Sequence, residues 1–158
     1  MDKLAICNAA LMRCGSEPIA LAELTTPTSK RGLAVTSQYE ITLKEILNDS
    51  PWNFATKRVE LEATGDTPLF KFTQQYVLPL DTIRILELED KVEYRIEESL
   101  LLCDVEGTVK VKYIFFQNDP TKYSGAFVKA FYLKLAEDIS YLMVQSAALQ
   151  GAITTEAE

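Results

Sequence analysis

The spacing of hydrophobic residues changes twice along this chain, and these changes limit the fold more than any single motif does. Up to Pro51, apolar residues recur every three or four positions, which is typical of amphipathic helices. They then alternate with polar residues, and near Ser124 the helical spacing returns. Helices and strands grouped in this way favour an α+β fold over an alternating α/β fold. We expect a helical lobe, residues 1–55 and 117–158, into which an antiparallel β lobe, residues 56–116, is inserted.

Three segments have the helical spacing. Asp2 can cap a first helix that ends at Gly15, and Ser29 can cap a second. A third, long helix is expected to begin near Ser124 and to end at Gly151, leaving a loose acidic tail. The residues expected to be buried are Leu4, Cys7, Leu11 and Cys14 on the first helix, Val35, Tyr39, Leu43, Ile46 and Leu47 on the second, and Phe127, Phe131, Leu135, Ile139 and Leu142 on the third.

The central region has the pattern of short strands. Phe70 and Phe72 alternate with Lys71, which indicates extended chain, and four further runs follow with very short connections. Such connections join antiparallel neighbours, so the sequence predicts a meander whose alternating charges form solvated cross-strand pairs. The four runs are Ile83–Leu88, Val92–Ile96, Ser99–Cys103 and Thr108–Phe115.

A proline and two aromatic residues mark the passage from helix to strand. Pro51 lacks an N–H and clashes with the preceding turn, so it ends the second helix. Trp52 and Phe54 follow it, and large aromatic residues at such a position most simply pack two layers together. We therefore expect Pro51, Trp52 and Phe54 to form a buried structural joint between the lobes.

The composition excludes several kinds of chemistry. The chain has no histidine, which excludes Ser–His and Cys–His catalysis and histidine metal sites. Cys7, Cys14 and Cys103 lack the spacing of a zinc site or a disulfide framework, and we expect no catalytic, cofactor or metal site. A net charge of −7 argues against a dedicated nucleic-acid binder. Without an apolar run of membrane-spanning length or a signal peptide, the chain is expected to be made in a cytoplasm, with no membrane partner.

Two alternative functions stay open, and the first depends on clustered carboxylates. A glycan hydrolase needs two carboxyl groups at a defined separation, one of them with a raised pKa. Here the acidic residues fall in predicted hairpin turns, where they are expected to be solvated. The second alternative is a small module that binds one partner through its β sheet. The clustered acidic residues are Glu87, Glu89, Asp90, Glu93, Glu97, Glu98, Asp104 and Glu106.

Two regions carry apolar residues that suggest contacts with another chain. Adjacent residues on a strand face opposite sides, so only one of Phe115 and Phe116 can face a single core. After Leu142 the residues are small and mildly apolar, and we expect 146–158 either to become ordered when docked in an assembly or simply to fray as a chain end. The candidate interface residues are Phe116, Met143, Val144, Leu149 and Ile153.

Five motifs together resemble one protein family. They are the opening helix DKLAICNAALMRCG, the runs SPWNFATKR (50–58) and YVLPLDTIRIL (76–86), a DxxG turn at 104–107, and Asp119–Pro120 before FVKAFYLKLAEDI. In this order and spacing they resemble the tail tubular protein A family, the head-to-tail adaptors of short-tailed phages.

The resemblance implies a structural virion protein without enzymatic activity or cofactor. Proteins of that family assemble in the host cytoplasm as a ring, dodecameric in the family, between the portal protein and the tail nozzle protein of the tail tubular protein B type. The ring extends the channel through which DNA passes without sequence-specific binding, and the carboxy-terminal region reaches toward the portal. An acidic ring suits such a channel, since a basic lumen would hold phosphates.

Overall fold

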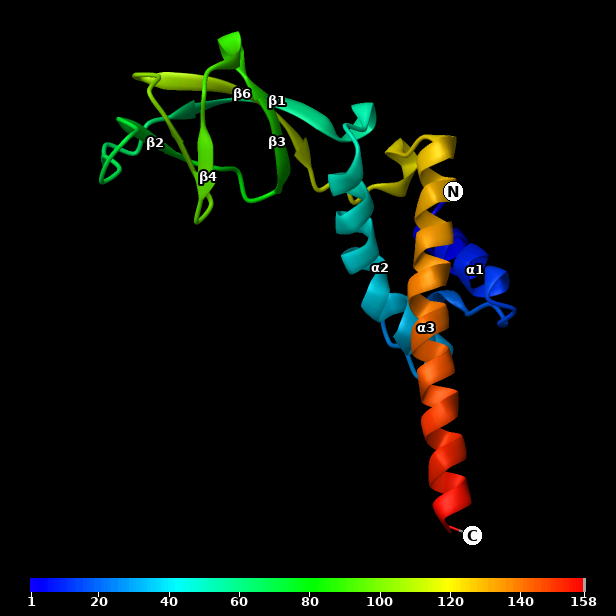
Figure 1. The fold of residues 1–158 in the computed structure, drawn as a ribbon. Coiled ribbons are helices and arrows are strands. Elements are labelled where there is room, and N and C mark those ends of the chain that lie inside the picture. The colour runs from blue at the N-terminus through cyan, green and yellow to red at the C-terminus, as the bar shows by residue number, and fades with distance from the viewer. Residues whose placement is uncertain (158) are drawn as a thin grey trace. The chain divides into compact units, whose positions relative to one another are not determined.

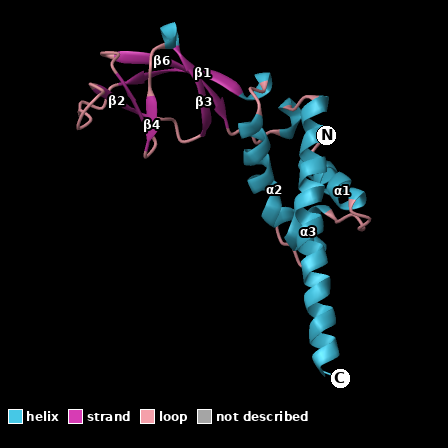
Figure 2. Ribbon diagram, viewed as in Figure 1, coloured by secondary structure: helices cyan, strands magenta, loops and turns pink. Residues whose placement is uncertain are grey.

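The computed structural model describes the backbone of residues 1–157 and the side chains of residues 1–144. Within these residues the fold is α+β, as the sequence predicted, with three α-helices and two small antiparallel sheets (Figure 2). The helices are α1 (Lys3–Arg13), α2 (Lys30–Asp49) and α3 (Gly125–Ala157), and the strands are β1 (Thr56–Glu62), β2 (Gln74–Val77), β3 (Thr82–Leu88), β4 (Arg95–Glu97), β5 (Leu100–Cys103) and β6 (Thr108–Phe115).

The chain divides into two compact units. The helical unit comprises residues 1–46 and 118–158, and the β unit comprises residues 47–117. The contacts therefore assign the last turn of α2, and the aromatic segment after it, to the β unit.

The caps expected from the sequence set the ends of the first two helices. The Asp2 carboxylate accepts a hydrogen bond from the Ala5 N–H at 2.8 Å and begins α1. Gly15 follows the end of α1 with a φ of 74°, a left-handed conformation that glycine adopts without strain. Ser29 accepts from the Gly32 N–H at 3.1 Å and begins α2.

Aromatic and polar contacts join α2 to α3 within the helical unit. The rings of Tyr39 and Phe131 lie 4.9 Å apart, and the buried Thr42 hydroxyl donates to the Asp138 carboxylate at 2.8 Å. On the other side, α1 packs against α3, where the Cys14 thiol donates to the Ala136 carbonyl at 3.1 Å. The predicted buried residues of all three helices are buried, except that Leu4 and Cys14 are half-buried and Leu142 is exposed.

The third helix is longer than the sequence predicted. It begins after Ser124, whose hydroxyl accepts from the Phe127 N–H at 3.2 Å, and it continues through Gly151 to Ala157 (Figure 1). The predicted end at Gly151 and the loose tail are therefore corrected. A glycine inside a helix costs only about 1 kcal/mol relative to alanine, which the neighbouring good helix formers offset. The side chains of Leu149 and Ile153 lie outside the described residues.

The predicted meander is wrong, although every strand pair is antiparallel. One sheet has the order β1-β6-β3 and the other β2-β5-β4, so among the runs of the expected meander only β4 and β5 are neighbours both in sequence and in a sheet. At the end of β3 the chain turns out of its sheet through Asp90 and Lys91, whose φ angles are 61° and 52°. It then enters the second sheet instead of pairing back onto β3.

A single core explains this arrangement. The strands alternate apolar and polar residues, so a flat sheet of them would leave one apolar face in water. Two small sheets bury these faces against each other. The buried residues of the shared core are Tyr76, Leu78, Leu88, Leu101, Cys103, Val109, Val111 and Tyr113.

Substitution of Phe131 with alanine should lower the free energy of unfolding by about 3–5 kcal/mol, because the ring is fully buried against other aromatic rings. Tyr141→Ala is the matched control on the same helix, since its ring is mostly exposed, and should cost less than about 1 kcal/mol. Urea unfolding followed by circular dichroism measures both. Equal losses would contradict the assignment of the helical core.

Candidate interaction surfaces

The motif YVLPLDTIRIL supplies structural contacts of the β unit. Its Tyr76 is fully buried and donates to the Val105 carbonyl. Its Asp81 carboxylate accepts from the Tyr113 hydroxyl at 3.0 Å and from the Lys57 ammonium at 3.3 Å, while the Asp81 carbonyl accepts from the Phe116 N–H at 2.7 Å. The contacts of Asp81 hold β1, the end of β6 and the turn before β3 together.

The motif SPWNFATKR is less buried than predicted. Pro51 lies two residues after the end of α2 and is exposed, and the rings of Trp52 and Phe54, 5.9 Å apart, are only half-buried. Within this segment the fully buried side chain is that of Ala55. The segment is tied to the β unit through the Phe54 carbonyl, which accepts from the Gln117 amide at 3.2 Å. A role as the joint between the lobes stays a prediction.

Four of the clustered carboxylates lie near lysines or backbone donors. On the outer face of the first sheet, Glu87 lies 3.9 Å from Lys112, and Glu89 lies 3.8 Å from Lys110. This face forms a shallow groove of about 620 Å³. Elsewhere, Glu93 pairs with Lys71 at 3.2 Å and Asp104 accepts from the Thr73 N–H at 3.0 Å. Exposed ion pairs of this kind contribute little stability and suit a solvated surface.

Among the described residues, no group of three or more Cys, Asp or Glu side chains is placed to hold a metal ion. In the same part of the chain, no helix has the length and apolar character needed to cross a membrane. The Cys7 thiol is fully buried, and burial raises its pKa to about 11, so it is a structural and unreactive group.

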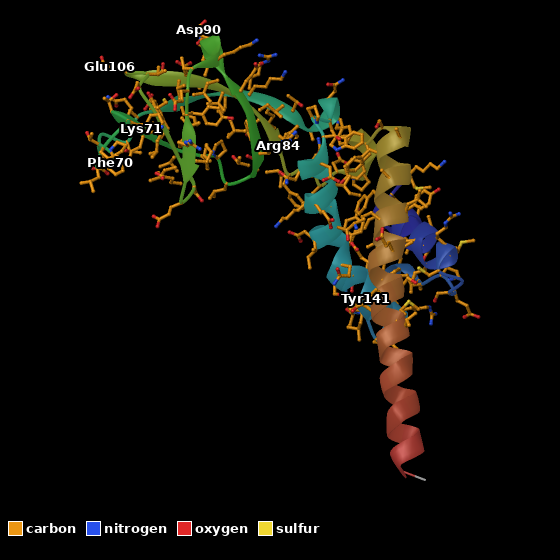
Figure 3. All side chains as sticks on the ribbon, in the orientation of Figure 1. Phe70, Lys71, Arg84, Asp90, Glu106 and Tyr141 are labelled. Carbon is orange, nitrogen blue, oxygen red and sulfur yellow. The ribbon has the colours of Figure 1, made fainter. Side chains whose placement is uncertain are left out.

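Exposed apolar residues gather on one part of the β unit, which we name the β face. Leu69 and Phe70 are 97% and 79% exposed, and Leu80 and Ile96 are also exposed. Figure 3 shows Phe70 and Lys71 on a loop at the edge of the β unit. Two grooves of about 480 and 440 Å³ share Ile96, which makes the face continuous.

The β face is basic at its rim, although the whole chain is acidic. The charged residues that line its two grooves are Lys71, Arg84, Arg95 and Glu97. The sequence pattern did not reveal this face, because the alternation of Phe70 and Phe72 with Lys71 places both rings on one side of an extended chain. Instead, Lys71 has a φ of 74°, so the chain turns there and only Phe72 is buried.

A second apolar surface lies in the helical unit, between α2 and α3, and we name it the helical groove. Ile41 and Tyr141 are 59% and 66% exposed and line it with Leu142. Figure 3 labels Tyr141 on α3. Its volume is about 520 Å³. Its charged lining residues are Glu45, Glu137 and Asp138.

One lysine lies within reach of all three of these carboxylates. The Lys134 ammonium is 3.8 Å from Asp138, 3.6 Å from Glu45 and 3.7 Å from Glu137. The charges of Asp138, then Glu45 and Glu137, raise the pKa of Lys134. Three carboxylates against one ammonium leave the groove with an excess of negative charge.

The remaining candidate interface residues that the structure describes belong to different units. Val144 is exposed on α3 and Met143 is half-buried. Phe116 belongs to the β unit and is half-buried next to the end of β6. An interface role for these residues stays a prediction.

Comparison with known proteins gives no further assignment: no family model and no curated protein sequence matches this chain.

The contact between Tyr113 and Asp81 predicts a loss of stability at alkaline pH. Burial, and then the hydrogen bond to Asp81, raises the pKa of Tyr113 from 10.0 to about 12. The folded state therefore holds this proton more tightly, and the stabilisation is complete below pH 10 and is lost as the pH rises through about 12.

Tyr113→Phe removes this ionisation and one hydrogen bond, so it should cost about 1 kcal/mol at neutral pH and reduce the alkaline decline. Urea unfolding at a series of pH values measures both effects. Parallel alkaline declines of the variant and the unmodified protein would contradict the assignment.

Proposed function

We propose that this protein is a head-to-tail adaptor of a short-tailed phage, a structural virion protein of the tail tubular protein A type. The order of its five motifs supports this function. Within YVLPLDTIRIL, Tyr76 and Asp81 make contacts that hold fold elements together, which suits a structural protein.

The observation that carries the proposal is the pair of exposed apolar surfaces, the β face and the helical groove. Exposed clusters of large apolar residues beside charged rims are typical of protein–protein contact sites. Neither surface presents a nucleophile with an activating base. An assembly protein needs several such contacts, because it must bind its own copies and the proteins on either side of it.

The partners in this proposal are the portal protein, a nozzle protein of the tail tubular protein B type, and further copies of the chain in a ring, dodecameric by analogy with the family. DNA passes through the ring in the virion without sequence-specific binding. The net charge of −7 suits this passage, since excess carboxylates do not hold phosphates.

Assembly should depend on the portal. We expect the purified protein to be monomeric at micromolar concentration and to co-migrate with its purified portal ring, because binding sites held close together raise the effective concentration of neighbouring copies. Size-exclusion chromatography with mass measurement tests this at moderate salt. Failure to co-migrate with the portal would remove the main support for an adaptor function.

The rival function, a glycan hydrolase, predicts an activity that we do not expect. Its carboxyl pair would lie among the acidic residues of the β unit, where Glu87 and Glu89 instead lie beside lysines. We expect no saccharide turnover above background in a reducing-sugar assay. Robust turnover that is lost in Glu87→Gln or Glu89→Gln, with melting unchanged, would overturn the adaptor proposal.

A further inference from the structure

The conformation of the loop that carries Leu69 and Phe70 leaves both side chains exposed to solvent. Phe72 is buried and Pro68 is half-buried, so both ends of the loop are held to the β unit. Between them the positive φ of Lys71 turns the chain, and the two large apolar side chains remain almost fully exposed. A monomeric protein gains nothing from this arrangement, since both side chains give up the stabilisation of burial.

The helical groove is complementary to this loop in shape and in charge. It is concave and lined by the apolar side chains of Ile41, Tyr141 and Leu142, whereas the loop projects outward. Its excess of carboxylates faces water at Glu137, whose side chain is 74% exposed. The loop carries a cation, Lys71, whose ion pair with Glu93 is exposed and therefore easily exchanged.

We propose that the helical groove is the docking site for the Leu69–Phe70–Lys71 loop of a second copy of this chain. Leu69 and Phe70 enter the groove against Ile41 and Tyr141, and the Lys71 ammonium lies against the carboxylates at its rim. The choice of a second copy rests on charge complementarity, because the chain carries an acidic apolar groove on one unit and a basic apolar loop on the other.

Loop and groove are different surfaces, so the contact is heterologous. Each copy donates its loop to one neighbour and receives the loop of another, and such contacts form a ring when the rotation between neighbouring copies closes. As a ring contact this inference rests on the proposed adaptor function, whereas the pairwise contact is tested without any portal.

Two variants test the contact when they are mixed, because one has a disrupted loop and the other a disrupted groove. Phe70→Asp removes the apolar tip of the loop and keeps the groove, and Ile41→Lys blocks the groove and keeps the loop. Both positions are exposed, so both variants should fold, which circular dichroism checks. Sedimentation velocity and amide NMR shifts at concentrations up to about 1 mM cover the range of weak association.

We expect the unmodified protein to grow beyond a dimer as its concentration rises, with shifts at the loop and at the groove in the same range. Each variant alone should associate roughly 30-fold or more weakly. Their mixture should form a discrete one-to-one pair, because one variant supplies the loop and the other the groove. Variants that associate like the unmodified protein, or a mixture that does not pair, would overturn the proposal.

Variants with reversed charges test the same contact independently through the strength of their association. Lys71→Glu or Glu137→Lys alone should weaken association roughly tenfold, and the double variant should recover most of it. Added salt should weaken the unmodified contact. Without recovery in the double variant, the predicted pairing of Lys71 with the groove is wrong.

The outcomes also separate this inference from the adaptor function. If the protein binds the portal and only the portal causes NMR shifts at the groove, the groove is a portal site. That result would refute the loop–groove contact and leave the adaptor function standing. A protein that self-associates through loop and groove but never binds the portal would leave the contact standing and remove the adaptor.

Discussion

The β unit depends on one constraint, which is that its strands alternate apolar and polar residues and so offer one apolar face. A meander of such strands would leave its apolar side in water unless another layer covered it. The chain avoids this by crossing at Asp90 and Lys91 from one small sheet to the other, so that Leu88, Leu101 and Val111 share a core. The contact of Asp81 with Tyr113 and Lys57 then fixes the entry into β3.

This constraint explains which parts of the fold could be predicted from the sequence. Caps and stripes are local, so Asp2, Ser29 and the buried positions of α1 to α3 follow from neighbours three or four residues away. Strand order is a long-range property that period-two alternation does not contain, and the short connections suggested the wrong pairing for β3 and β6. Likewise, local preference for a stop at Gly151 was weaker than the helix-forming tendency around it.

The interaction surfaces were harder to predict for a related reason. A sequence pattern separates apolar from polar residues, and it does not reveal which apolar residues remain outside once the core is filled. Phe70 and Phe72 have the same side chain and both adjoin Lys71, yet the turn at Lys71 leaves one exposed and the other buried. The exposed pair and the groove of Ile41 and Tyr141 became visible only when the folded chain showed what the core had left uncovered.

The two exposed apolar surfaces, the β face and the helical groove, carry charges of opposite sign. In the proposed ring, neighbouring copies of an acidic chain meet like-charge repulsion, which grows as the copies approach. Local reversal of that charge is one physical solution, and the basic rim of the β face, with Lys71, Arg84 and Arg95, provides it where apolar area is also exposed. The acidic excess around Lys134 provides the opposite sign on the helical unit. In the proposed adaptor, net negative charge then remains on the other surfaces, where it suits the passage of DNA, and attraction is confined to the proposed contacts between copies.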